Sequence, residues 1–508
     1  MSFLTRLRWA SLEVVVFLAG ALLMTYEIIG SRVLAPYIGT STYVWTSLIG
    51  VILASLSLGY WLGGVIADRR PKVSVLAGAL LIAGAAVAAM LLIKDLALSG
   101  ISSLTLGLEI QSLLAALILF APASVCLGFV TPFAAKLRLA SLDSAGKTVG
   151  RLYALSTVGS IVGTFVAGFF LIPFVGSTRT LYIIMFGLLG LSMLLAPFSI
   201  SRTNISALVL MITAVGVSEV SSYFLWTTHE LVDVDTEYNR VQVFRAKDPA
   251  TDRDIRAMQI DPSATQSAMF LDSDELVFAY SRFYHLARYY DPTFQRVLVI
   301  GGAGYSIPKE MLRRYPQAQM DVVEIDPRMT EIARRFFRLD NDPRLNIEHQ
   351  DGRIFLNHAP SETYDVIMID AFSSLFSVPD QLTTIEAVHE VKRLLRDDGV
   401  VIFNLGSAVS GSASGFLQAE MNTYRTVFDQ VDLYKVHFDR PDDELQNLIV
   451  VASNSTKPRN DETDDAELKP LLANRYAFEA DPQFPILTDD LSPVQYYASI
   501  AMNSRAQR

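Results

Sequence analysis

Long apolar stretches dominate the first part of the chain. Seven of them are long enough to cross the roughly 30 Å hydrocarbon core of a bilayer as helices. They lie at residues 12–35, 43–66, 74–98, 110–134, 151–174, 180–199 and 204–224. The pattern predicts a multi-span α-helical membrane bundle over residues 1–225. The last stretch is the weakest, because Glu219 and several serines would also suit a helix in the interface.

Glycines and charged residues within these stretches allow further predictions. Gly159, Gly163 and Gly168 are small enough to let two helices approach closely. Glu27 and Arg32 are costly in a membrane, so each is expected to face the protein interior or a polar cavity. Because five positions separate them, they do not share one helix face well, and separate partners are favoured. A structural role and a transport or lipid-headgroup role both remain open.

The pattern changes near Leu231. Residues 238–245 and 257–260 alternate as strands do, which predicts a small β unit and a lead-in helix over residues 226–290. Short apolar strands then alternate with helices. We predict strands at 297–300, 320–324, 345–348, 366–369 and 400–404, and helices at 308–315, 329–337 and 384–395. Such alternation is typical of an α/β, Rossmann-like domain with a parallel sheet covered on both faces, here over residues 291–455. Residues 456–508 form a C-terminal extension.

Charge separates the two halves. Residues 1–225 hold thirteen Lys and Arg against seven Asp and Glu, whereas the remainder holds 29 against 45, within a total net charge of −10. The acidic half argues against a nucleic-acid partner, whose phosphates require the opposite sign. The single cysteine, Cys126, excludes a disulfide within one chain, and six scattered histidines show no metal-ligand spacing.

Basic residues gather in alternate loops of the predicted bundle, at Arg6 and Arg8, at 69–72, at 136–151 and at Arg202. The positive-inside rule then places the N-terminus in the cytoplasm. Seven crossings from there would put the acidic half outside, where a nucleoside cofactor is not expected. Cofactor supply favours a cytoplasmic catalytic domain, so charge and chemistry disagree here.

Polar and glycine residues follow the strands where a nucleoside would bind. In open α/β sheets, ligands bind beyond the carboxyl ends of the strands. Gly301, Gly302 and Gly304 follow the first strand and leave room for the backbone to approach a ligand, although such loops also serve only to pack a helix. Glu324 ends the second strand, 22 residues after Gly302, the position from which a carboxylate can bind both ribose hydroxyls.

The glycine loop favours S-adenosylmethionine over a dinucleotide. A pyrophosphate site requires Gly-x-Gly-x-x-Gly, and residues 301–307 lack the third glycine. Asp351 and Gly352, after the third strand, would suit the adenine, because the carboxylate accepts from the exocyclic amine and the glycine leaves space for the ring.

Several motifs together resemble the spermidine synthase family of polyamine aminopropyltransferases. They lie at residues 297–302, 322–326, 342–344, 351–353 and 364–370. The similarity covers about residues 235–455, and the whole chain resembles membrane-fused bacterial members of the family. The family transfers the aminopropyl group of decarboxylated S-adenosylmethionine to putrescine and releases methylthioadenosine.

The resemblance implies roles for individual residues. Glu324 would hold the ribose, Asp351 and Gly352 the adenine, and Asp370 would accept a proton from the amine. Asn239 stands where the family has a Gln beside the thioether. The residues implied for the acceptor or for a gate over the site are Gln266, Tyr280, His285, Ser373 and Pro379.

One carboxylate is enough for this chemistry. A primary amine has a pKa of about 10.4 and must lose a proton before it can attack. Asp370 at a strand end could accept that proton while favouring the cationic donor. Two other roles for Asp370 remain open from the residues alone, a helix cap and a non-catalytic binding residue.

The chain departs from the family at both amine anchors. The family's loop reads Gly-Gly-Gly-Asp-Gly, but Gly304 or Tyr305 stands at the position of its Asp. Its Asp-x-x-Asp-Pro motif begins here at Asp370 and continues Ala371-Phe372-Ser373-Ser374, without the second carboxylate. Because burying an unpaired ammonium is costly, ordinary recognition of putrescine is in doubt.

Three functions are therefore compared. The first is a membrane-anchored aminopropyltransferase that uses decarboxylated S-adenosylmethionine or S-adenosylmethionine and an amine acceptor, without a metal. The second transfers a methyl or aminocarboxypropyl group to a lipid or small molecule. The third is a nucleoside-sensing domain on a transporter-like bundle, since residues 59–72 look like a loop motif of major facilitator transporters. The expected location is a bacterial inner membrane, and a homodimer is left open.

Overall fold

The chain divides into two compact units, Met1–Val241 and Gln242–Arg508, in a computed structural model. The structure describes residues 3–39, 41–104, 106–139, 145–196, 201–261, 264–371, 379–454 and 463–506. Ser373 lies outside these described residues.

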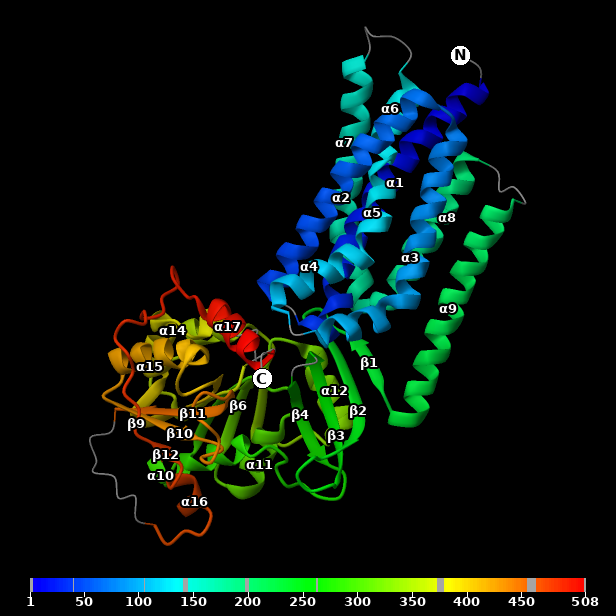
Figure 1. Cartoon of the computed structure of the whole chain (residues 1–508). Coiled ribbons are helices and arrows are strands. Elements are labelled where there is room, and N and C mark those ends of the chain that lie inside the picture. Colours follow the sequence, from blue (N-terminus) through cyan, green and yellow to red (C-terminus); the bar gives the residue numbers. More distant parts are fainter. Residues whose placement is uncertain are drawn as a thin grey trace. The chain divides into compact units, whose positions relative to one another are not determined.

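The first unit is helical (Figure 1). Its elements are α1 (Phe3–Ile38), α2 (Thr42–Arg69), α3 (Val73–Ser102), α4 (Leu108–Leu119), α5 (Ala121–Gly128), α6 (Val130–Arg138), α7 (Ala145–Val166), the π-helix η2 (Ala167–Val175), α8 (Ser177–Leu195) and α9 (Arg202–His229). In the described part of the chain, six helices are long and apolar enough to cross a membrane. The predicted fourth span is instead a pair of helical segments, Leu108–Leu119 and Ala121–Arg138, bent by 54°. Pro122 stands at the start of α5, where a missing backbone N–H breaks the helical ladder.

Glycines bring α1 and α7 together. A Cβ at Gly159 would lie 1.9 Å from the backbone oxygen of Phe17, and one at Gly163 would lie 2.2 Å from that of Ala21. Any larger residue would push the two helices apart, as predicted for these two glycines. Gly168 differs, because a Cβ there would meet no described atom within 4 Å.

The two ends of α1 meet different parts of the same unit. Near its start, Glu13 pairs with Arg138 of α6 and with Arg151 of α7, the latter at 2.8 Å. Near its end, Arg32 donates to the backbone oxygen of Glu237 at 2.7 Å. Asp235 also accepts from the backbone N–H of Ser177 at 2.7 Å. The chain therefore leaves this unit at the end of the bundle opposite the start of α1.

A small antiparallel sheet follows the bundle, as the alternation predicts. Its four strands lie in the order β1-β2-β3-β4. They are β1 (Val232–Asp235), β2 (Arg240–Lys247), β3 (Asp254–Asp261) and β4 (Ala264–Phe270). The boundary between the two units falls within β2.

The second unit contains an eight-stranded sheet with the order β12-β10-β11-β9-β8-β5-β6-β7. Its strands are β5 (Arg296–Ile300), β6 (Gln319–Val323), β7 (Leu345–Glu348), β8 (Tyr364–Ile369), β9 (Leu395–Ser407), β10 (Gln430–Lys435), β11 (Gln446–Ser453) and β12 (Arg475–Tyr476). β5 to β9 are parallel, which confirms the Rossmann-like prediction. The pairs β9–β11, β11–β10 and β10–β12 are antiparallel, so the C-terminal part of the chain adds an antiparallel edge.

Helices cover this sheet. They are η3 (Tyr280–Leu286), α10 (Ala287–Tyr290), α11 (Ser306–Arg314), α12 (Pro327–Phe336), α13 (Gly352–His358), η4 (Asp380–Leu382), α14 (Ile385–Leu394), η5 (Ser412–Ser414), α15 (Gly415–Val427), α16 (Leu468–Leu472) and α17 (Val494–Ala506). Alternate residues of the strands, such as Leu298 and Ile300, face one core shared with α14 and α15. Because the chain starts this sheet at β5, moves to β6 and β7, and returns to β8 on the other side, its topology switches between β5 and β8.

Candidate active site

The switch between β5 and β8 brings Asp370 beside the glycine loop. The backbone N–H of Asp370 donates to the oxygen of Ile300 at 2.9 Å, which continues the pairing of the two strands. Gly301 follows with φ +98°, and a Cβ there would lie 2.4 Å from the backbone oxygen of Asp370. Only glycine fits this position, since both the backbone conformation and the close approach exclude a side chain.

These residues line a cavity of about 260 Å³. Its described lining includes Asp370, the loop residues 301–303, Gln266 of β4 and Tyr280 of η3. Two ends of parallel strands, one strand of the small sheet and one short helix therefore meet around one hollow at the carboxyl edge of the large sheet.

Asp370 accepts two side-chain hydrogen bonds. Tyr280 donates its hydroxyl to Oδ2 at 3.0 Å, and Asn404 donates Nδ2 to Oδ1 at 2.9 Å. Burial raises the pKa of Asp370 to about 6, although these two donors act in the opposite direction. The same burial, with the charge of Asp370, raises the pKa of Tyr280 well above its usual value, so Tyr280 stays a donor. In the described structure the carboxylate of Asp370 is therefore held by Tyr280 and Asn404, and not by backbone N–H groups at the start of a helix.

Asn404 is a site residue that the sequence analysis did not single out. It is buried in β9 and donates to Asp370, and its own oxygen accepts from Asn447 Nδ2 at 3.0 Å. An amide within the apolar run 400–405 was the available signal, because a buried polar group in a strand requires a partner. Asn447 and His437 also line the cavity.

Glu324 lies beneath the glycine loop. Its Oε2 accepts the backbone N–H groups of Gly302 and Ala303 at 2.9 and 3.0 Å, and its Oε1 accepts that of Asp326 at 3.0 Å. Burial raises the pKa of Glu324 even though these amides favour its charge. A carboxylate offers about four acceptor positions, so three are used here. Binding both ribose hydroxyls would require the loop to release one amide, and the ribose role stays a prediction.

Asp351 caps a helix in this structure. Its Oδ1 accepts the backbone N–H groups of Arg353 and Ile354 at the start of α13. Gly352 packs tightly, because a Cβ would lie 2.8 Å from Ile300 Cγ2. Neither residue is among those that line the 260 Å³ cavity, so the adenine role also stays a prediction.

Gly304 and Tyr305 serve packing where the family has an amine-binding Asp. A Cβ at Gly304 would lie 2.3 Å from Ser267 Oγ, so the loop fits against β4 only with glycine there. The side chain of Tyr305 is buried, and its hydroxyl bonds to Thr330 Oγ1 at 2.7 Å. Neither position offers an anion to an ammonium group.

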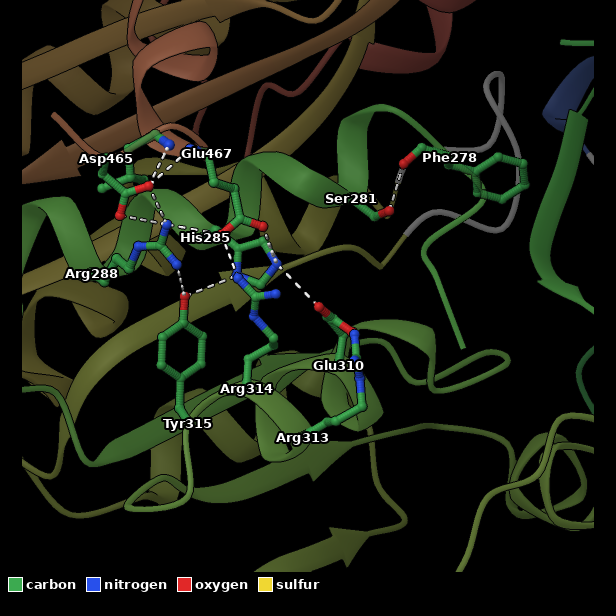
Figure 2. A network of polar contacts seen from close by, with 11 residues as sticks. Phe278, Ser281, His285, Arg288, Glu310, Arg313, Arg314, Tyr315, Asp465 and Glu467 are labelled. Carbon is green, nitrogen blue, oxygen red and sulfur yellow. Dashed lines mark hydrogen bonds and ion pairs between the residues drawn. The ribbon is translucent and has the colours of Figure 1, made fainter. Parts of the chain in front are cut away.

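His285 belongs to a different polar network (Figure 2). Its Nδ1 bonds to the Tyr315 hydroxyl at 2.9 Å, and its Nε2 lies 3.4 Å from Glu310 Oε1. The predicted contact with an acceptor must therefore be corrected: His285 does not line the cavity as Tyr280 does. The reason is the three-residue period of the 3₁₀ helix η3, which turns residues five apart toward different sides.

Two further predicted residues have defined places. Asn239 lies in the first unit, in the turn before β2, where its backbone N–H donates to Thr236 Oγ1 at 2.8 Å. Pro379 directly precedes η4. Gln381 of η4 accepts from Arg353, which also pairs with Asp489 at 2.9 Å. The C-terminal extension thus contacts the start of α13.

The chain resembles known proteins in its second half. Residues 277–457 match the model of the spermine/spermidine synthase domain. A polyamine aminopropyltransferase of Vibrio vulnificus is 29% identical over 233 residues, which are 43% of this chain and 75% of that protein. A polyamine aminopropyltransferase of Clostridium acetobutylicum is 30% identical over 139 residues. These residues are 26% of this chain and 48% of that protein, so the match spans about half of that relative.

A solved structure gives a weaker likeness. That of a probable spermidine synthase from Corynebacterium glutamicum is 19% identical, covers 51% of this chain and 97% of its own, and has a TM-score of 0.43. The sequence matches agree with the strand-end positions of the glycine loop and Asp370. Over its second half the chain is similar to the spermine/spermidine synthase domain and to polyamine aminopropyltransferases.

Proposed function

We propose that this chain is a membrane-anchored aminopropyltransferase. Its donor would be decarboxylated S-adenosylmethionine, its acceptor an amine, and its proton acceptor Asp370. The observation that supports this most directly is the environment of Asp370. It lies beside the glycine loop in the cavity, with two donors on its carboxylate and a pKa of about 6.

The proposed reaction needs a base that is ionised at neutral pH but still takes a proton. A pKa of about 6 leaves most of Asp370 ionised at pH 7 and makes it a better proton acceptor than an ordinary aspartate. Tyr280 and Asn404 hold the two oxygens in fixed directions, which reduces the motion needed when the amine arrives.

Anchoring in a bacterial cell membrane is the second part of the proposal. It is supported by the six apolar helices and the bent pair in the first unit. We place the catalytic unit in the cytoplasm because of the supply of a nucleoside donor. The basic residues at the N-terminal end of the bundle favour the reverse orientation.

The test uses the full chain, purified in detergent, with decarboxylated S-adenosylmethionine and putrescine. Release of methylthioadenosine is expected, and Asp370→Asn should lower kcat by roughly 10²- to 10⁴-fold, the usual contribution of a general base. An exposed substitution, Asp464→Asn, is the matched control. Release of S-adenosylhomocysteine from S-adenosylmethionine would show a methyltransferase instead. Tight nucleoside binding without turnover of either donor would show a sensing domain.

A further inference from the structure

The cavity that holds Asp370 has little negative charge. Among the described residues that line it, Asp370 is the only carboxylate. The other polar lining residues are neutral and include Gln266, Ser267, Ser306, Asn404, His437 and Asn447. Burial and nearby Arg440, opposed by the charge of Asp439, hold the pKa of His437 below its usual value, so its ring is mostly uncharged at neutral pH.

His437 and Asn447 form one wall of the cavity, and one carboxylate close to this wall in sequence, Asp442, has other partners. Asp442, in the turn between β10 and β11, accepts from Lys435 Nζ at 2.7 Å and from the Tyr476 hydroxyl at 2.6 Å. Residues 371–378, which follow Asp370, contain no Asp or Glu. Apart from Asp370, the described polar residues that line the cavity therefore supply amides, hydroxyls and an imidazole.

The charge of the reactants makes this composition decisive. The sulfonium donor brings positive charge into the cavity before the acceptor arrives. A diamine would add the ammonium group at its far end, and a buried ammonium without a paired carboxylate is strongly disfavoured. A neutral hydroxyl or amide at the same place would instead find hydrogen-bond partners in Asn447 and in the uncharged ring of His437.

We propose that the acceptor of this site is a primary amine with a neutral far end, such as an amino alcohol, and that His437 and Asn447 select it over a diamine. This inference rests on the proposed aminopropyl transfer and specifies its substrate class. In the reaction, the lone pair of the amine nitrogen forms a bond to the donor's methylene carbon. The carbon–sulfur bond breaks, its electron pair returns to sulfur to give a neutral thioether, and the nitrogen's proton passes to Asp370.

The experiment compares acceptors of equal chain length on the full chain. 4-Aminobutan-1-ol, n-butylamine and putrescine are each supplied with decarboxylated S-adenosylmethionine. Both methylthioadenosine and the aminopropylated product are measured. We expect kcat/KM for 4-aminobutan-1-ol to exceed that for putrescine by about tenfold or more, the ratio that corresponds to a difference of about 1.4 kcal/mol. A kcat/KM for putrescine equal to or higher than that for 4-aminobutan-1-ol would overturn this inference but not the proposed function. If none of the three acceptors leads to release of methylthioadenosine, both the proposed function and this inference are overturned.

A designed variant tests the wall itself. His437→Asp adds a carboxylate and should move the ratio toward putrescine by about tenfold, as expected for one added ion pair at a partly buried site. His358→Asp is the matched control, because His358 is an exposed histidine on α13 and should leave the ratio unchanged. If His437→Asp does not fold, Asn447→Asp places the charge on the same wall. A folded variant with an unchanged ratio would exclude this wall as the selecting element.

Discussion

Asp370 shows how a single residue can be adjusted by its neighbours. Its pKa of about 6 reflects burial, opposed by hydrogen bonds from Asn404 and Tyr280. We expect kcat/KM to rise with pH and to level off above about pH 6, because the ionised form is the base. Asn404→Ala removes a donor to the ionised form, so the pKa of Asp370 should rise and the acid limb should move to higher pH. Profiles of methylthioadenosine release for both proteins test this, and coincident acid limbs would show that another group titrates.

Glu420 is a second acid in an unusual environment. It is fully buried on α15, and in the described structure neither of its carboxyl oxygens has a hydrogen-bond partner. Burial raises the pKa of Glu420 well above its usual value. The folded state therefore holds a proton that the unfolded state has released above about pH 4.3, so this group lowers stability as pH rises toward its folded pKa.

The substitution Glu420→Gln keeps the shape of the side chain and removes its ionisable carboxyl group. We expect its advantage in Tm over the wild type to be larger at about pH 8 than at about pH 5. Thermal unfolding of the detergent-solubilised chain measures this, and Glu479→Gln, an exposed glutamate, is the control. A Tm difference that does not change with pH would contradict the prediction.

At the scale of elements, charged side chains join the C-terminal extension to the helices behind the site (Figure 2). Asp465 and Glu467, just before α16, both pair with Arg288 of α10, at 2.8 and 2.9 Å. Glu467 also pairs with Arg314 at 2.5 Å. η3, which precedes α10 directly, carries both Tyr280 and His285, so the extension is linked to the element that supplies a donor to Asp370.

This network predicts local loosening without loss of fold. Each partly exposed pair contributes roughly 0.2–1 kcal/mol, so the double variant Asp465→Asn and Glu467→Gln should leave the sheet intact. Amide hydrogen exchange in α16 is expected to speed up, since the segment loses its anchors. Asp464→Asn changes the neighbouring exposed acid and is the control. Equal exchange in the double variant and the control would mean that apolar contacts of Leu468, Leu471 and Leu472 hold the segment alone.

At the scale of the whole molecule, the bundle decides where the termini lie. α1 starts beside Arg138 and Arg151 and ends beside Glu237, so the length of α1 separates its start from the exit of the chain to β2. If each of the six apolar helices and the bent pair crosses the proposed membrane once, the number of passes is odd. We expect tags at the N- and C-termini to be labelled from opposite faces of sealed vesicles. Labelling of both tags from the same face would show that the bent pair re-enters instead of crossing.

The local pattern of the sequence was sufficient to predict several features of the fold and the site. The apolar lengths predicted the helical bundle, and the alternation from Arg296 onward predicted the parallel strands β5 to β9. Motifs at strand ends indicated Asp370 and the glycine loop, and the family resemblance implied Tyr280 and Gln266. The structure brings Asp370, Tyr280, Gln266, Gly301 and Gly302 to one cavity. Local pattern predicts the elements because strands and helices repeat every 2 and 3.6 residues, and strand-end motifs meet because parallel strands end at one edge.

Contacts between distant segments decided the rest. The pairing of β9 with β11, the hydrogen bond from Asn404 to Asp370 and the hydrogen bonds of Glu324 with the glycine loop each join residues more than 20 positions apart. The sequence alone also grouped His285 with the site, although the 3₁₀ geometry of η3 turns it toward Glu310 and Tyr315. Such features depend on which surfaces pack together in three dimensions. Burial, the direction of a side chain and the number of charges in a cavity are properties of that packing, and no local pattern specifies them.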